Sequence, residues 1–302
     1  MSFRLVNQST AFAFNPGDSA HARLWHKHKV GFNPCVSGTG TNIVDLSPSK
    51  YAFARTGAAG TSVVVSPIGP GTVYAANTGH RQTAASWGLP CKFMTTANED
   101  ELTVQAVFKF NHSAVAKESV IFESDTRTLG ANVPRGYKLM VDNNADKVQL
   151  MCANTPDELL TFPCYYKSVA LTPGQWYHVV FSFGGFLGQS IEDDATTFAY
   201  LWLDGVRAYP TIVGTEQNVT HVASKHATIG ATFGSTAPDI SVAQVNVWNR
   251  FLRVGEIALL HRDPLAMFRR RRLVLGMVPA AGGRLISIGG TALRGTNLRV
   301  AG

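Results

Sequence analysis

The sequence predicts an all-β protein, an antiparallel jelly-roll β-sandwich with one short helix near its C-terminal end and an extended arm at each end. Many short segments alternate apolar and polar residues with a period of two, as strands with one buried face do. The composition agrees, because 28 Gly, 14 Pro and only 16% charged residues among 302 suit strands joined by turns better than a helical bundle. The 45% hydrophobic content is ample for a packed core.

Taken in order, the chain offers a mixed apolar and basic segment at 24–32, short apolar runs at 63–65 and 73–74, and a clear alternation over 102–110. Further strands are predicted at 119–123, 137–142, 147–153, 176–183, 197–203, 206–209, 227–231 and 240–248. Asp204-Gly205 predicts a tight hairpin turn, since both residue types accept positive φ angles. Only 253–261 looks helical, with Ile257 and Leu260 on one face.

The net charge of +7 is not spread over the chain. Basic and acidic residues balance up to Asp263, and the excess comes from the arginines that follow it. We therefore predict three parts, an N-terminal arm at 1–20, a sandwich at 21–265 and a basic C-terminal arm at 266–302.

Several motifs occur in an order that suggests a family. They are Asp45-Leu46-Ser47, the strand 102–110, Pro173-Gly174-Gln175-Trp176-Tyr177-His178-Val179-Val180, Leu201-Trp202-Leu203-Asp204-Gly205, Ile229-Gly230, and Ala243-Gln244-Val245-Asn246-Val247-Trp248-Asn249-Arg250. Over about residues 21–265 the chain resembles the LamG-like, concanavalin A-like lectin/glucanase domains. One departure is Leu252-Arg253, where relatives usually place a serine that caps the final helix, so we expect a weaker cap.

The resemblance implies a sandwich that carries lectins, glycosidases, adhesion modules and viral structural domains alike. The segment 259–269 is similar to the ending of LamG-like proteins of tailed bacteriophages, which implies a virion protein assembled in the host cytoplasm. The start of the chain shows no secretory signal, and no apolar run is long enough to span a membrane.

Enzymatic and metal sites are weakly indicated. Glycosidases of the laminarinase type carry three carboxylates at alternate strand positions, but Glu123-Ser124-Asp125-Thr126-Arg127 has an arginine in third place, so we expect no hydrolysis. His26 and His28 lack a third ligand, and we interpret them as exposed. No cofactor is predicted. Calcium remains a candidate, with oxygen ligands at Glu192-Asp193-Asp194 and at Asp142, Asp146 and Asp239, although solvated loops explain these residues as well.

Two binding surfaces are predicted. The C-terminal arm contains too much Leu, Ile and Val for a disordered nucleic-acid tail, so docking to other virion proteins or to a second copy is favoured over nucleic acid. The docking residues would be Arg269, Arg270, Arg271, Arg272, Leu273, Leu275, Leu285 and Ile288. The alternative function is binding of host-surface glycans through aromatic residues, with Trp87, Tyr165 and Tyr166 as candidates. We expect a non-enzymatic virion structural protein, a capsid decoration or tail component, anchored by the arm.

Overall fold

The computed structural model describes residues 12–37, 42–48, 50, 52–56, 61–74, 80–83, 89–91, 101–110, 119–125, 136–142, 147–153, 164–166, 170–183, 199–208, 211–213, 222–224, 226–230, 240–271, 275–277, 286–288 and 291–292. Four short helices occur in these ranges, η1 (Ala22–Trp25), α2 (Pro34–Ser37), α4 (Val254–Arg262) and η2 (Ala266–Phe268). None of the helices there is both long and apolar enough to cross a membrane.

The rest of the regular structure is β. The strands are β1 (His28–Phe32), β2 (Asn42–Val44), β3 (Ala52–Thr56), β4 (Thr61–Ser66), β5 (Gly69–Tyr74), β6 (His80–Thr83), β7 (Leu89–Cys91), β8 (Leu102–Phe110), β9 (Ser119–Asp125), β10 (Gly136–Asp142), β11 (Lys147–Ala153), β12 (Cys164–Tyr166), β13 (Trp176–Phe183), β14 (Ala199–Leu203), β15 (Val206–Ala208), β16 (Thr211–Val213), β17 (Val222–Ser224), β18 (His226–Ile229), β19 (Ile240–Trp248), β20 (Leu275–Met277), β21 (Ile286–Ile288) and β22 (Thr291–Ala292). The predicted all-β antiparallel class is confirmed.

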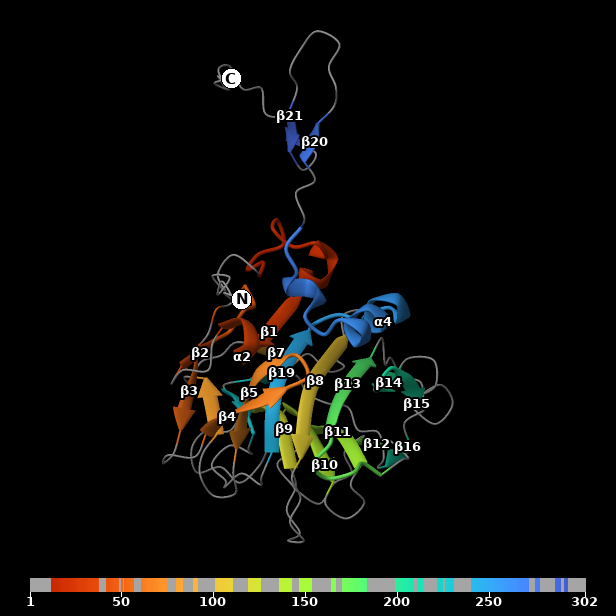
Figure 1. Cartoon of the computed structure of the whole chain (residues 1–302). Coiled ribbons are helices and arrows are strands. Elements are labelled where there is room, and N and C mark those ends of the chain that lie inside the picture. Colours follow the sequence, from red (N-terminus) through yellow and green to blue (C-terminus); the bar gives the residue numbers. More distant parts are fainter. Residues whose placement is uncertain are drawn as a thin grey trace.

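Two antiparallel sheets form the sandwich (Figure 1). An eight-stranded sheet has the order β15-β14-β13-β8-β19-β5-β4, and β1 also pairs with β19. A nine-stranded sheet has the order β16-β12-β11-β10-β9-β18-β6-β3-β2. Two small sheets complete the fold, β17 with β7 and the separate group β20-β21-β22. β4-β5 and β14-β15 are local hairpins, but the central neighbours β13, β8, β19 and β5 are far apart in sequence, so long-range pairing holds the centre of the sheet together.

The core between the sheets comes from the alternation seen in the sequence. On β8 the alternate residues from Leu102 to Phe110 face this core, and β13 contributes Tyr177, Val179 and Phe181 in antiparallel register with it. On β14, Leu201 and Leu203 face inward, while Trp202 packs on the other side of the sheet. Burial of these side chains is the main stabilising term of the fold.

The other face of the eight-stranded sheet is also buried, under what we call the outer layer, residues 12–25 and 252–271. A second apolar cluster lies there, formed by Leu24, Trp25, Val36, Leu46, Val180, Trp248, Leu252, Ile257, Leu260, Leu265, Ala266, Met267 and Phe268. The two ends of the layer pair with each other, since the N–H of Ala13 donates to the Phe268 carbonyl at 2.7 Å and that of Ala20 to the Arg269 carbonyl at 2.8 Å. Residues on both sides of the predicted limits 21 and 265 thus pack on the sandwich.

Most predicted strands match, and the helix predicted at 253–261 is α4. The N-terminal part differs. The single strand predicted at 24–32 is the 3₁₀ helix η1 followed by β1, and His26 lies between them. The interpretation of His28 as exposed is wrong, because its side chain is only 2% exposed under Trp25 and Trp248. The outer layer, which the local pattern does not reveal, buries it.

We expect Gly205→Ala to destabilise the protein by about 2 kcal/mol or more. Gly205 has φ +77°, and a Cβ at this position would collide with the His261 ring on α4. Gly174→Ala is the matched control, since Gly174 has φ +82° but nothing within 4 Å of the added carbon. Chemical unfolding of both variants measures the difference. Equal losses would show that α4 does not press against the Asp204-Gly205 turn.

Candidate functional site

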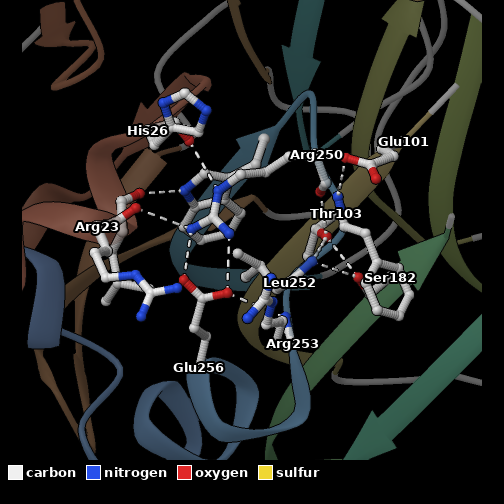
Figure 2. A network of polar contacts seen from close by, with 12 residues as sticks. Arg23, His26, Glu101, Thr103, Ser182, Arg250, Leu252, Arg253 and Glu256 are labelled. Atoms are coloured by element: carbon white, nitrogen blue, oxygen red, sulfur yellow. Dashed lines mark hydrogen bonds and ion pairs between the residues drawn. The ribbon is translucent and has the colours of Figure 1, made fainter. Parts of the chain in front are cut away.

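Arg250, directly after β19, ties three segments together (Figure 2). Its Nε donates to the His26 carbonyl at 2.9 Å, and its Nη2 donates to the Arg23 carbonyl at 3.0 Å. Two further bonds of 2.9 Å reach the two carboxylate oxygens of Glu256 on α4. The planar guanidinium fits this role because it can donate along several directions at once. Arg250 therefore fixes η1 and the first turn of α4 to the end of β19.

Two hydroxyl groups of the eight-stranded sheet bind the backbone from Arg250 to Leu252. The Thr103 hydroxyl on β8 donates to the Arg250 carbonyl at 2.8 Å and lies 2.7 Å from the Ser182 hydroxyl on β13. The N–H of Leu252 donates to both hydroxyl oxygens, at 3.1 Å to Thr103 and 3.0 Å to Ser182. The first residues of the outer layer are thus bonded directly to the sheet.

The predicted weak cap of α4 is seen in the structure. Arg253 occupies the N-cap, and its side chain does not cap the helix; instead, Glu256 accepts the Arg253 N–H at 3.0 Å. Burial raises the pKa of Glu256, but the hydrogen bonds from Arg250 and from the Arg253 backbone outweigh it and leave that pKa below its ordinary value. Glu256 is therefore charged at neutral pH and serves the structure rather than acid-base chemistry.

An open depression of about 550 Å³ lies around this network. We call it the Arg250 depression; its lining consists of Arg23, His26, Lys27, Glu101, Arg250, Phe251, Arg253 and Glu256. Arg23, His26, Lys27 and Arg253 are exposed, and Phe251 is half-buried. Lys27 is held at φ +54° while its carbonyl accepts the Asn249 N–H at 3.0 Å. A polar hollow with one aromatic ring, on a rigid base, has the size and chemistry of a small-ligand site.

A second polar feature is a buried row that crosses the eight-stranded sheet beneath the outer layer. His28 on β1 lies 3.2 Å from the Asn246 side-chain oxygen on β19, and Asn246 donates at 2.9 Å to Gln105 on β8. Gln105 Nε2 lies 3.0 Å from His178 Nε2 on β13, and His178 Nδ1 lies 3.3 Å from Nδ1 of His261 on α4. These contacts link the sheet to α4 through amides and imidazoles.

The hydrogen bonds on the β13 side of the row all run in one direction, each residue donating to the next. Asn246 and Gln105 each donate toward β13, so His178 Nε2 accepts and its Nδ1–H donates to His261. Burial lowers the pKa of His178 to about 3, and neighbouring His261 adds to the effect. Burial likewise lowers the pKa of His28 to about 4, against the opposing hydrogen bond with Asn246. The row is buried from His28 to His178 and reaches the half-buried His261 at its end, and we interpret it as a structural element.

The candidate carboxylates for hydrolysis lie on β9, far in the topology from the Arg250 depression. Glu123 is 2% exposed and sits in register between Lys138 on β10 and Thr228 on β18. Asp125 ends the strand, and Arg127 lies outside the described residues. Glu123 therefore lies buried between two neighbouring strands of the nine-stranded sheet.

The predicted docking residues are divided among different parts of the chain. Arg269 forms an ion pair with Asp263 of the same chain, through bonds of 2.7 and 3.0 Å, so it stabilises the outer layer. Arg270 and Arg271 are exposed beside the segment that contains Asp18 and Ser19. Leu275 and Ile288 are register partners in the separate sheet. Arg272, Leu273 and Leu285 lie outside the described residues.

The predicted glycan and calcium residues are either absent from the lining of the depression or outside the described residues. Tyr165 and Tyr166 belong to β12, where they pair with Leu150 and Gln149, whereas Trp87 lies outside the described residues. Asp142 ends β10, while Asp146, Glu192-Asp193-Asp194 and Asp239 are outside the description. Among the residues that the structure describes, no group of His, Cys, Asp and Glu side chains has the arrangement of a metal site.

The residues of the Arg250 depression were missed by sequence reasoning. Arg23 belongs to no motif, Lys27 was seen only as part of the basic segment 24–32, and Arg253 only as a poor helix cap. Arg250 is the last residue of the motif at 243–250, and in the structure it binds two backbone carbonyls and a carboxylate. That motif was the signal in the sequence that lay nearest to the depression.

A model of the concanavalin A-like lectin/glucanases superfamily matches residues 81–258, more than half of the chain. The chain belongs to this superfamily. The matched residues include Thr103 on β8, Ser182 on β13 and Arg250 after β19. The base of the depression is therefore part of the superfamily fold. A search of curated proteins by sequence finds no match.

Solved structures give the same fold. The binding domain of botulinum neurotoxin serotype D is 12% identical, with a TM-score of 0.53, over 82% of this chain and 53% of that one. Trypanosoma rangeli sialidase in complex with sialic acid is 14% identical, with a TM-score of 0.52, over 79% of this chain and 33% of that one. The chain thus spans about half of the toxin domain and a third of the sialidase. Identities this low show similarity of fold only.

Proposed function

We propose that this protein is a non-enzymatic carbohydrate-binding domain that contacts glycans in the Arg250 depression. The observation that carries the proposal is the open hollow of about 550 Å³, in which polar side chains and the half-buried Phe251 surround a fixed guanidinium. Sugars present hydroxyl groups and apolar C–H faces together, so a site with several polar groups and one aromatic ring suits them. Membership in a lectin-containing superfamily supports the proposal.

The arrangement favours binding over hydrolysis. Glycosidases need two carboxyl groups free to act as acid and as base or nucleophile. In the depression Glu256 is held by Arg250 in a bidentate pair, and Glu101 accepts the Phe251 N–H at 3.1 Å. Both carboxylates thus hold the backbone or a neighbouring cation in place, and we infer that the site binds without turnover.

A glycan array with the purified chain tests this proposal. We expect selective binding to a subset of glycans, weakened about tenfold or more by Phe251→Ala, because an aromatic contact at the centre of a site is commonly among its strongest. Val65→Ala is the matched control, since Val65 is an apolar residue 84% exposed on β4, away from the depression. No binding on the array, or equal loss with both variants, would contradict the proposal.

A second function rests on a separate observation. The strands β20, β21 and β22 form their own sheet, drawn beyond the end of the sandwich in Figure 1 and following the chain from the outer layer. Strands of two or three residues make too small a sheet for independent stability. We propose that a partner covers it, and that the partner is another virion protein or a second copy of this chain.

Deletion of residues 272–302 is expected to leave a folded monomeric sandwich that no longer associates. The cut spares the ion pair of Arg269 with Asp263 and the buried Met267 and Phe268, which a cut at 266 would remove. Light scattering on both forms, and incorporation into particles when co-expressed with virion proteins, measure the effect. Unchanged assembly of the shortened chain would exclude a docking role for this segment.

A further inference from the structure

The Arg250 depression carries an excess of positive charge that its own contacts do not use. Four of its side chains are cationic and two are carboxylates. The guanidinium of Arg250 is fully engaged with Glu256 and with two backbone carbonyls, so these two charges cancel. Glu101 remains against three other cations.

Those three cations are available to a ligand. Arg23, Lys27 and Arg253 are exposed, and among the described residues no hydrogen bond or ion pair holds their side chains, although the charge of Arg23 contributes to the lowered pKa of Glu256. They come from different segments, η1, the turn before β1 and the N-cap of α4, and line one hollow. Figure 2 shows Arg23 and Arg253 on either side of Glu256, which Arg250 binds. Their position is therefore set by the fold and not by local sequence.

We propose that the depression selects glycans that carry an anionic group, a carboxylate or a sulfate ester, a proposal that rests on the carbohydrate-binding function above. Planar guanidinium groups match such oxyanions through two parallel hydrogen bonds, and charged hydrogen bonds are stronger than neutral ones. Phe251 lies in the same hollow and offers an apolar surface to the sugar ring. Anion and ring are thus recognised by different residues.

The shape of the site argues against a long polyanion. The hollow is open to solvent and has a volume of about 550 Å³, within the range of small-ligand sites, and Glu101 and Glu256 form part of its lining. A nucleic-acid groove would instead follow the backbone with a continuous row of cations, and carboxylates beside it would repel phosphates. The occupant that fits is a short glycan with one charged terminal residue.

The test compares matched ligands by isothermal titration calorimetry with the full chain. The ligands are an oligosaccharide with a terminal carboxylate, the same compound as its methyl ester, a sulfated counterpart and the neutral parent. We expect the anionic forms to bind at least tenfold more tightly than the ester and the neutral parent, because one charged hydrogen bond contributes about that factor. Affinity should also fall as salt rises.

The variants Arg23→Gln and Arg253→Gln are each expected to weaken binding of the anionic glycans about tenfold, and to leave the neutral parent and the melting temperature unchanged. Arg262→Gln is the control, because Arg262 is an exposed cation at the far end of the same helix. Equal affinity for the acid and its ester would overturn this inference and leave carbohydrate binding standing. Full displacement by an equal concentration of inorganic sulfate would also overturn it, since the sugar would then contribute nothing.

Failure of all the glycans to bind would count against the proposed function itself, which separates the two results.

Discussion

Replacing Arg250 by alanine is expected to lower the free energy of unfolding by about 3 kcal/mol or more. The change leaves the Glu256 carboxylate, whose side chain is only 15% exposed, without its ion pair. It also removes the side-chain donor to the His26 carbonyl and one of the two donors to the Arg23 carbonyl, which keeps the His26 N–H. Breaking a largely buried pair from one side costs more than the pair contributes, because the remaining charge stays desolvated. Urea unfolding monitored by tryptophan fluorescence measures the loss.

Two further variants show whether the loss of stability comes from the hydrogen bonds of Arg250 or only from removal of a positive charge. Arg250→Lys keeps the charge but cannot donate in all these directions, so we expect it to lie between wild type and alanine. Arg262→Ala, which removes an exposed cation at the end of α4, should change the stability by less than about 0.5 kcal/mol. If Arg250→Ala were no less stable than Arg262→Ala, the three segments would not depend on this residue.

Acid is expected to destabilise the protein well before its carboxylates titrate. His28 and His178 have pKa values of about 4 and about 3 in the folded chain, both below the ordinary 6.5 that they regain on unfolding. Below pH 6.5 the unfolded chain therefore binds protons that the folded chain excludes, so stability falls with falling pH. The loss is about 2 kcal/mol per imidazole by pH 5 and continues toward the folded pKa values.

The groups around the two imidazoles explain why protonation is resisted. His28 lies against Trp25, Trp248 and Asn246, and the charge of Arg250 further lowers its pKa. A proton on His178 Nε2 would place a donor against the Gln105 amide and a charge beside His261. The Asp204 carboxylate accepts the His178 backbone N–H at 2.8 Å. Protonation of His178 is therefore expected to weaken the contact between β13 and α4.

The pH effect is measured by unfolding at several values between pH 7.5 and 4.5. His178→Gln removes one titrating group. The number of protons taken up on unfolding, which sets the slope of unfolding free energy against pH, should therefore fall by about one near pH 5.5. His26→Gln is the control, because His26 is exposed and contributes only its carbonyl to the network. An unchanged slope in His178→Gln would show that the buried row does not control acid stability.

Local patterns were sufficient for most strands. The alternation in 102–110 and 176–183 predicted β8 and β13, and Asp204-Gly205 predicted the turn, which has φ +49° and +77°. The same patterns failed where burial comes from remote segments. The alternation in 102–110 predicts one buried face, yet Thr103 and Gln105 on the other face are also fully buried, because residues from both ends of the chain cover that face.

The sequence by itself determined the sandwich, its superfamily and the helix after Arg250, because strand periodicity, turn chemistry and ordered motifs are properties of neighbouring residues. Only the tertiary structure decided where the site lies. Arg23 and Arg253 are 230 positions apart and belong to no motif, and they meet because one guanidinium binds the backbone of η1 and the first turn of α4 together. A contact between such distant segments leaves no periodic signal in the chain.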